Sequence, residues 1–193
     1  GTEVKDVKLW IFNADDGSLV EEKHYGSAQE VASQRFALPE GSYRILAATN
    51  LTEPFTVGEQ TRALTNWNNI QIGLTNPKDV NHNAYFGVAD VKIDNKEGNY
   101  VVQNPVKSAL SELTIIIENV PQGTEMSGKA LDCAWCLFPT QKNSDGEYGL
   151  PSIDPTEVEM PTILATESTL QSEVIRLMPT IQGSPASHIY LRL

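Results

Sequence analysis

Short runs of alternating polar and apolar residues, each ended by a turn, constrain the fold of this chain more than any other feature. Residues 7–12 (VKLWIF) alternate, residues 13–18 (NADDGS) contain the Asp-Gly pair that suits a tight hairpin, and residues 19–25 (LVEEKHY) are typical of the returning strand. Helix signals are few, whereas a parallel α/β sheet would need a helix between successive strands. The sequence therefore predicts an all-β protein built as a β-sandwich.

The same pattern continues along the chain and is interrupted at a few places. Ser27 and Glu30 have the spacing of a capping box, which predicts one short helix or a loop at 26–34, and a second weak helix signal lies at 61–67. The polar, proline-containing residues 139–161 predict an extended loop. Further strands are predicted at residues 39–50, 69–74, 84–93, 100–106, 111–120, 129–138, 168–179 and 187–193.

The length of 193 residues allows one large domain or two small ones. We expect an N-terminal sandwich over residues 1–120 and a boundary near 121–128 (PQGTEMSG). Residues 121–193 either start a second, partial sandwich or complete the first. Within the first sandwich, alternation predicts a core stripe in the first strand at Val7, Leu9 and Ile11, and places Ile115 and Ile117 in a central strand.

Charge and hydropathy exclude two classes of partner. The formal net charge of −11 repels phosphate backbones, so nucleic acid is not an expected partner. No apolar run approaches the roughly 18 residues of a membrane-spanning helix. We therefore expect no membrane-spanning helix in this sequence.

The two cysteines, Cys133 and Cys136, raise the question of redox or zinc chemistry. A reactive pair needs a helix N-terminus, which the apolar flanks do not provide, and the three histidines of the chain lack the spacing of zinc ligands. In a regular strand, residues three apart face opposite sides. We therefore predict a core strand in which Trp135 shares the face of Cys133. A disulfide remains an alternative that would need an irregular backbone such as a bulge.

Motifs for catalysis are missing from the sequence. It contains no G-x-S-x-G elbow, no H-E-x-x-H pair, no phosphate loop and no G-x-G-x-x-G. The acidic turns at 13–18 and 143–147 lack the ligand series of a calcium loop. The sequence therefore predicts a protein that is not an enzyme and has no catalytic residues, metal or cofactor.

Tryptophan gives the one candidate for ligand contact. Trp10 lies within an apolar strand and is predicted to be in the core, as is Trp135. Trp67 instead has amide neighbours that could bind sugar hydroxyls, and this group defines the alternative function, a carbohydrate-binding β-sandwich module of a secreted protein. The candidate glycan contacts are Trp67, Asn66, Asn68 and Asn69.

Two segments near the N-terminus resemble a known family. Residues 4–25 and 35–51 resemble the opening of Bacteroidetes fimbrillin-like proteins, and most closely the anchor and tip subunits of type V pili. The shared pattern is V-x-x-V-x-L-x-I-F-(N/D) with a D-G-x-L-V hairpin, followed by L-P-x-G-x-Y and A-(A/T)-N-L. It falls on Val4, Val7, Leu9, Ile11, Phe12, Asn13, Gly17, Leu19, Val20, Leu38, Pro39, Gly41, Tyr43, Ala48, Asn50 and Leu51.

This resemblance implies a fold, a location and a mode of assembly. The fold would be a transthyretin-like Greek-key β-sandwich. The protein would be exported to the outer membrane surface as a fimbrial adhesion subunit, with its signal and lipid-bearing cysteine outside this sequence. Its partners would be other pilus subunits or surface proteins, and host or bacterial glycans are further candidates. Assembly would use β-strand exchange, for which the candidate residues are Val7, Leu9, Ile11, Ile189, Leu191 and Leu193.

Overall fold

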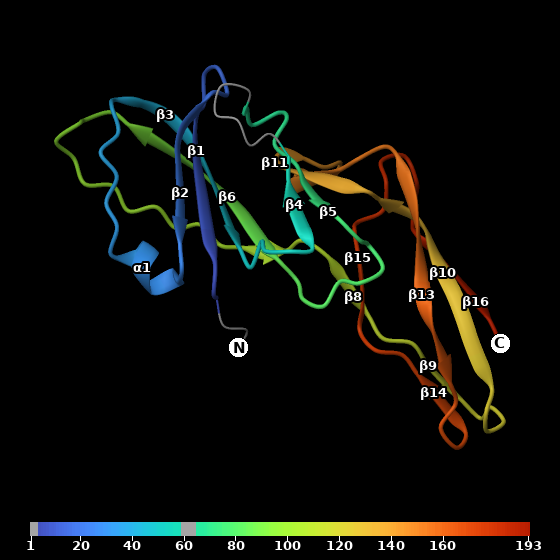
Figure 1. The fold of residues 1–193 in the computed structure, drawn as a ribbon. Helices are drawn as coiled ribbons and strands as arrows, with labels where there is room; N and C mark the ends of the chain where they lie inside the picture. The colour runs from blue at the N-terminus through green and yellow to red at the C-terminus, as the bar shows by residue number, and fades with distance from the viewer. Residues whose placement is uncertain (1–3, 59–64) are drawn as a thin grey trace.

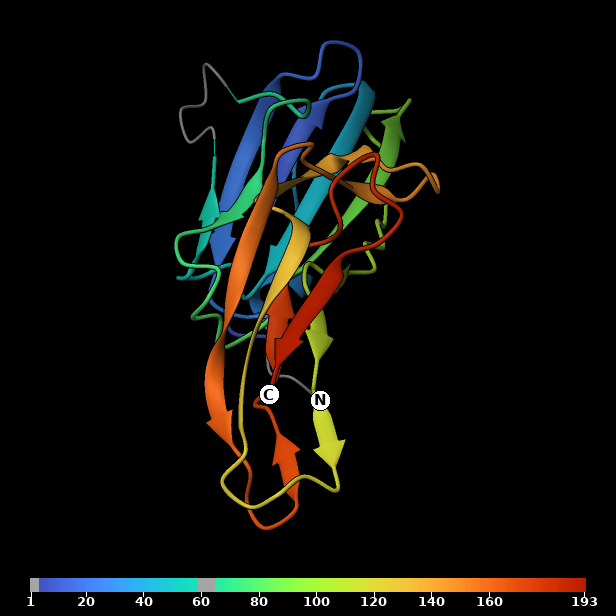
Figure 2. The same cartoon turned by 90° about the vertical axis from the view of Figure 1, so that its right-hand side faces the viewer.

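Strands dominate the computed structural model, which describes residues 4–58 and 65–193. The molecule is elongated, with a larger β-sandwich at one end and a narrower pair of layers extending from it (Figures 1 and 2). The prediction of an all-β sandwich protein is therefore confirmed. The Greek-key strand order and the domain boundary near 121–128 stay predictions.

The larger sandwich packs a five-stranded sheet against a four-stranded sheet. All pairings in both sheets are antiparallel. The five-stranded sheet contains, in spatial order, β2 (Leu19–Tyr25), β1 (Val7–Asn13), β3 (Gly41–Thr49), β6 (Tyr85–Ile93) and β7 (Lys107–Ser108). The four-stranded sheet contains β12 (Tyr148–Pro151), β11 (Cys136–Lys142), β5 (Ile72–Leu74) and β4 (Phe55–Val57).

Large aromatic and aliphatic side chains from both sheets fill this sandwich. In β1, Trp10 and Phe12 point into the main core, which confirms the prediction for Trp10. Val7 and Leu9 are also buried, but on the opposite face of the sheet, where they form a small cluster with Val31 of the short helix α1 (Ala28–Ala32). The predicted burial of Val7, Leu9 and Ile11 is confirmed, but Val7 and Leu9 pack in this smaller cluster and not in the main core, because both faces of β1 are covered.

Local signals in the first 35 residues are well reproduced. The Asn13 side chain accepts the Asp15 N–H at 2.8 Å, and Gly17 adopts the positive φ of +76° that closes the hairpin. Ser27 caps α1 by accepting the Glu30 N–H at 3.3 Å, so the short helix at 26–34 is confirmed. Of the weaker helix signal at 61–67, residues 61–64 lie outside the described residues.

The narrower part of the molecule has one layer of three strands and a facing layer of two chain segments. The three-stranded sheet contains β13 (Pro155–Leu164), β10 (Glu125–Ala134) and β16 (His188–Arg192). The facing layer consists of two short pairs placed end to end. They are β8 (Ser111–Leu113) with β15 (Ile175–Leu177), and β9 (Ile116–Glu118) with β14 (Thr169–Gln171).

The predicted strands at 111–120 and 168–179 are each interrupted, so neither is the single regular strand that alternation indicates. Their breaks lie side by side, where the Ile115 N–H donates to the Ser172 hydroxyl at 2.9 Å and the Ser172 N–H donates back to Ile115 at 2.9 Å. Ile115 and Ile117 are only partly buried, and their segment pairs on one side alone. The prediction of a central strand at this position is wrong.

Two further segment predictions are wrong. Residues 100–106 form no strand, and pairing begins only at β7. The expected loop at 139–161 instead holds most of β11, all of β12 and much of β13. Proline explains the second error, because β13 lies at the edge of its sheet, where a residue without an N–H is tolerated. Val158 and Met160 of β13 alternate into the core as an ordinary strand does.

The two parts of the molecule share one continuous segment. β10 belongs to the narrow part and β11 to the larger sandwich, and only Trp135 separates them. The chain bends at this residue, so its side chain is 44% exposed rather than in the core as predicted. Residues 136–151 therefore complete the larger sandwich by pairing β11 with β5. Met178, which follows β15, lies in the same core.

Candidate functional site

The C-terminal strand β16 presents a sheet edge to solvent. It pairs with β10 through five residues, from Ser127 opposite Arg192 to Leu131 opposite His188. Its other edge has no partner strand among residues 4–58 and 65–193. An unpaired edge carries a row of backbone donors and acceptors that can add a further strand. β16 therefore has the geometry that strand addition requires.

The side chains of β16 are apolar on one face, whereas the other face carries His188, Tyr190 and Arg192. Ile189 lies opposite Ala130 and Leu191 opposite Gly128, so these two side chains share the face that β10 turns toward the core. Each remains 38% exposed, whereas Ala130 is fully buried. Tyr190 points to the other face and is 65% exposed, and Leu193 follows the strand at 63%. The apolar stripe on β16 thus extends beyond the layer that covers β10.

The other candidate assembly residues lie in a different setting. Val7, Leu9 and Ile11 belong to β1, which is paired on one side with β2 and on the other with β3. All three side chains are buried. The structure therefore does not bring them to a free edge or near β16, and a role for them in strand exchange stays a prediction.

The candidate glycan contacts lie in a turn that its own amides stabilise. The Asn69 side chain accepts the Asn66 N–H at 2.8 Å, and the Asn66 side chain accepts the Asn68 N–H at 3.0 Å. The guanidinium of Arg44 stacks on the Trp67 ring at 3.9 Å from its centroid, while Trp67 also packs against the main core. A sugar on this ring would have to displace Arg44. Glycan contact by this group stays a prediction.

Arg44 also contacts Asp90 and Tyr148 at the same end of the sandwich. Its guanidinium lies 5.7 Å from the Tyr148 ring, and its Nε donates to Asp90 at 3.2 Å. Burial raises the pKa of Tyr148, and the nearby Arg44 charge partly opposes this rise. Sequence reasoning missed this group, because the residues come from β3, β6 and β12 and no local pattern links them. An arginine at an inward-facing strand position was the only available signal.

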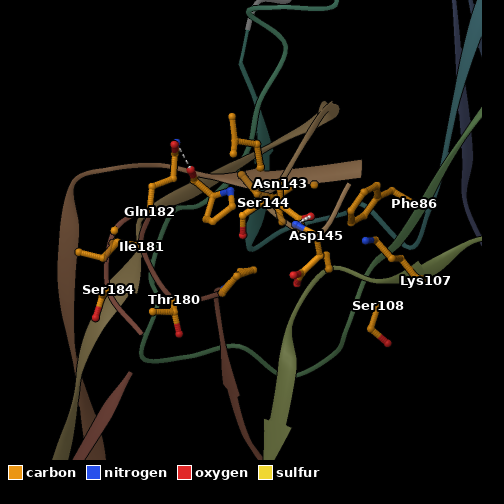
Figure 3. Close-up of a pocket in the computed structure, with 17 residues that line it drawn as sticks. Phe86, Lys107, Ser108, Asn143, Ser144, Asp145, Thr180, Ile181, Gln182 and Ser184 are labelled. Atoms are coloured by element: carbon orange, nitrogen blue, oxygen red, sulfur yellow. Dashed lines mark hydrogen bonds between the residues drawn. The ribbon is translucent and has the colours of Figure 1, made fainter. Parts of the chain in front are cut away.

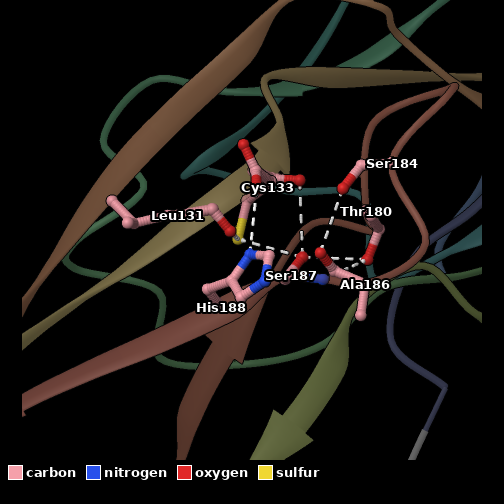
Figure 4. Close-up of polar contacts among 8 residues, drawn as sticks. Leu131, Cys133, Thr180, Ser184, Ala186, Ser187 and His188 are labelled. Atoms are coloured by element: carbon pink, nitrogen blue, oxygen red, sulfur yellow. Dashed lines mark hydrogen bonds and ion pairs between the residues drawn. The ribbon is translucent and has the colours of Figure 1, made fainter.

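The two cysteines are free and fully buried, and they lie in different sheets. Cys133 lies one residue before the end of β10, beside Ser187, at a sulfur–oxygen distance of 3.8 Å (Figure 4). Cys136 begins β11 and lies 3.6 Å from the Gln71 side-chain oxygen. Burial raises the pKa of both thiols. The two cysteines thus belong to separate parts of the molecule, Cys133 to the small cluster of the narrow part and Cys136 to β11 of the larger sandwich. Neither thiol has the low pKa of a reactive cysteine.

β10 contains a bulge-like irregularity of the kind that a disulfide would need, but this irregularity places Asp132 beside His188 instead. Strand register shifts between Ala130 and Cys133, where Asp132 adopts a φ of +62°. The Asp132 carboxylate lies 3.1 Å from His188 Nδ1, which ties β10 to the start of β16. Among the described residues, no group of three or more His, Cys, Asp or Glu side chains is arranged to hold a metal ion. In the same part of the chain, no helix is long and apolar enough to cross a membrane.

Comparison with known proteins identifies the family. The sequence profile of the fimbrillin-A associated anchor proteins Mfa1 and Mfa2 matches residues 1–186. The chain belongs to this anchor-protein family. No curated protein matches it. Membership of a fimbrial anchor family is consistent with the resemblance seen in the first 51 residues and extends it over nearly the whole chain.

Solved structures of similar fold come from Bacteroides and Porphyromonas species. A candidate adhesin from Bacteroides ovatus has a TM-score of 0.67 and 15% identity, covering 100% of this chain and 66% of that one. The fimbrial anchor protein Mfa2 from Porphyromonas gingivalis has a TM-score of 0.67 and 14% identity, covering 99% and 69%. A candidate adhesin from Bacteroides thetaiotaomicron has a TM-score of 0.62 and 13% identity, covering 98% and 69%.

These structural similarities show the fold of the anchor-protein family and no more, because all three identities are low. The chain spans about two thirds of the length of the structures that it matches. The free edge of β16 is the candidate site whose geometry suits strand addition.

Proposed function

We propose that this chain is part of a non-catalytic fimbrial subunit at the cell surface, held there by a lipid anchor, that joins its neighbours by β-strand complementation at β16. The observation that carries the proposal is the free, apolar edge of β16 in a member of a fimbrial anchor family. A donor strand beside β16 would pair its unbonded backbone groups and would cover Ile189 and Leu191. The expected partner is an extended segment of another fimbrial subunit.

The chemistry of β16 supports strand addition over chance exposure. Natural sheet edges are usually protected by charged residues, prolines or bulges. The middle of β16 instead carries three consecutive apolar or aromatic residues, Ile189, Tyr190 and Leu191, and the strand has a regular register with β10 throughout. By contrast, β13 at the opposite edge of the same sheet carries prolines at Pro155 and Pro161, so its N–H row is interrupted. The proposal therefore assigns the partner to the β16 edge.

The test introduces a charge on the apolar stripe in the cells that make the protein. Ile189→Lys and Leu191→Lys should lower the amount of fimbrial subunit that copurifies with the protein after crosslinking, because a donor strand would then bury an unpaired ammonium. Ile153→Lys is the matched control, since Ile153 is also exposed but lies outside the strands. Equal copurification by all three variants and the unmodified protein would refute assembly at β16.

A further inference from the structure

A cleft of about 490 Å³ opens at the side of the larger sandwich, away from the stripe on β16. It lies between the edge strands of the two opposing sheets, β7 and β12, and the 179–184 segment forms its third wall (Figure 3). A volume of this size is in the usual range of small-molecule sites. None of the residues that line it belongs to β16.

The cleft combines an apolar floor with a polar rim. Ile181 forms part of the floor, and beneath it lie Phe86 and Leu137 of the main core, which are only 2% and 1% exposed. Gly149 lets β12 approach this floor closely, because a Cβ at that position would lie 2.8 Å from the Phe86 ring. The rim carries hydroxyl, amide and charged side chains from three separate segments. They are Lys107, Ser108, Asn143, Ser144, Asp145, Thr180, Gln182 and Ser184.

Several rim groups are available to a ligand. The hydroxyls of Ser108 and Ser144 and the carboxylate of Asp145 make no hydrogen bond or ion pair within the described residues. Lys107 and Asp145 extend toward the same space from different walls (Figure 3). The loop that carries Asp145 is fixed by Asn143, whose side chain accepts the Asp145 N–H at 2.9 Å and the Glu147 N–H at 3.0 Å. The backbone that carries the Asp145 carboxylate is therefore fixed, while the carboxylate itself is exposed and makes no internal hydrogen bond or ion pair among the described residues.

We propose that this cleft binds a short saccharide of one or two sugar units. Sugar hydroxyls both donate and accept hydrogen bonds, which matches serine hydroxyls beside a carboxylate acceptor and an ammonium donor. The apolar floor suits the C–H face of a sugar ring. A phosphate-bearing ligand fits less well, because the net charge of the chain is −11, Asp145 lies on the rim, and Lys107 already pairs with Glu147 at 3.7 Å.

An extended peptide also fits less well than a saccharide. Strand addition gains most of its affinity from a continuous row of backbone hydrogen bonds. The strand β7 has only two residues, and β12 has four, ends at Pro151 and contains Gly149 at a φ of +112°. Neither edge offers the regular row that β16 offers. The two surfaces therefore differ in the chemistry of the ligand that each suits.

The test uses saturation-transfer NMR of the whole chain with a panel of neutral and amino-sugar monosaccharides and disaccharides. Calorimetric titration of the strongest binder then follows. Asp145→Ala should weaken binding by about tenfold or more, as expected when a charged hydrogen-bond acceptor is removed. Ser144→Trp should abolish binding by filling the cleft from the rim, because Ser144 is exposed and its side chain makes no internal contact to lose.

The chain offers a closely matched control in Asp15→Ala. Asp15 is also an exposed carboxylate whose N–H donates to an asparagine two residues earlier, at 2.8 Å, but it lies in the β1–β2 turn outside the cleft. Binding should survive this change. The proposal is overturned if no saccharide of the panel binds, if both cleft variants bind as well as the unmodified chain, or if extended peptides bind the cleft and saccharides do not.

Discussion

The two parts of this molecule use the same kind of strand but cover their cores to different extents. The larger sandwich buries Trp10, Phe12, Phe55 and Phe86 between sheets of five and four strands. The narrow part faces three strands with only two chain segments, and its two clusters contain no aromatic residue. The two segments do not cover the whole three-stranded sheet, so apolar side chains such as Ile189 remain partly exposed. The comparison shows a stable base joined to an incompletely covered part with sheet edges open to a partner.

The largest expected change in the free energy of unfolding comes from replacing one leucine in each part of the molecule. Leu137→Ala, in the larger core, should lower the free energy of unfolding by about 3–5 kcal/mol, because a close-packed site collapses poorly around the cavity. Leu177→Ala, in the narrow part, should lower it by about 2–3 kcal/mol, because fewer neighbours are lost. Urea denaturation followed by tryptophan fluorescence measures both. A larger loss at Leu177 would contradict the comparison.

The cysteines report the opening of each part separately. Both are fully buried, but Cys133 lies in the small cluster of the narrow part and Cys136 in the four-stranded sheet of the larger one. A buried thiol reacts only when its surroundings open, so Cys133 should be alkylated about tenfold faster than Cys136 in the native protein. Mass spectrometry of time points assigns each site, and urea-unfolded protein provides the control. Faster reaction at Cys136 would reverse the assignment of the less stable part.

The same thiols predict a pH dependence of stability. Burial raises the pKa of Cys133 and of Cys136 in the folded chain. The unfolded chain then loses its thiol protons first, near an ordinary pKa of about 8.5, while the folded chain keeps them. The free energy of unfolding should therefore fall as the pH rises above about 8.5 toward the folded-state pKa values. Cys133→Ala should reduce this slope in urea titrations at several pH values, and an unchanged slope would show that other groups cause it.

The smallest effect is expected at the free edge. Ile189→Lys should change the free energy of unfolding by no more than about 0.5 kcal/mol, because the side chain is partly exposed and the ammonium can reach water. Thermal unfolding of the purified chain provides the measurement. If the same variant also copurifies less fimbrial subunit from cells, the two results together would separate an assembly role of Ile189 from a structural one. A large destabilisation would place Ile189 in the core instead.

Local sequence patterns predicted the local structure. The Asn13–Gly17 turn, the Ser27 cap and the strands on either side of that turn follow from residues close together in the chain. Alternation also predicted a strand near the C-terminus, and β16 forms at 188–192. Ile189, Leu191 and Leu193 were also predicted as strand-exchange candidates, and β16 has one unpaired edge among the described residues. Its partner β10 could not be predicted, because register between distant segments is set by packing.

Errors arose where sheet position overrides local pattern. Pro155 and Pro161 indicated a loop, but an edge strand accepts them. The apolar run at 129–138 indicated one strand, but the bend at Trp135 divides it between two sheets. The cleft brings Lys107, Asp145 and Gln182 together from distant parts of the sequence. No spacing rule within the sequence connects such residues before the fold is known.

The path of the chain through Trp135 also sets the order in which the protein can fold. The core of the N-terminal sandwich includes Leu137 and Met178. A chain that emerges from its N-terminus during synthesis or export therefore cannot close this core until most of its length is available. The early strands must wait, with Trp10 and Phe12 uncovered, which is when a chaperone has the most apolar surface to bind. Folding of the whole unit is thus coupled to arrival of its final third.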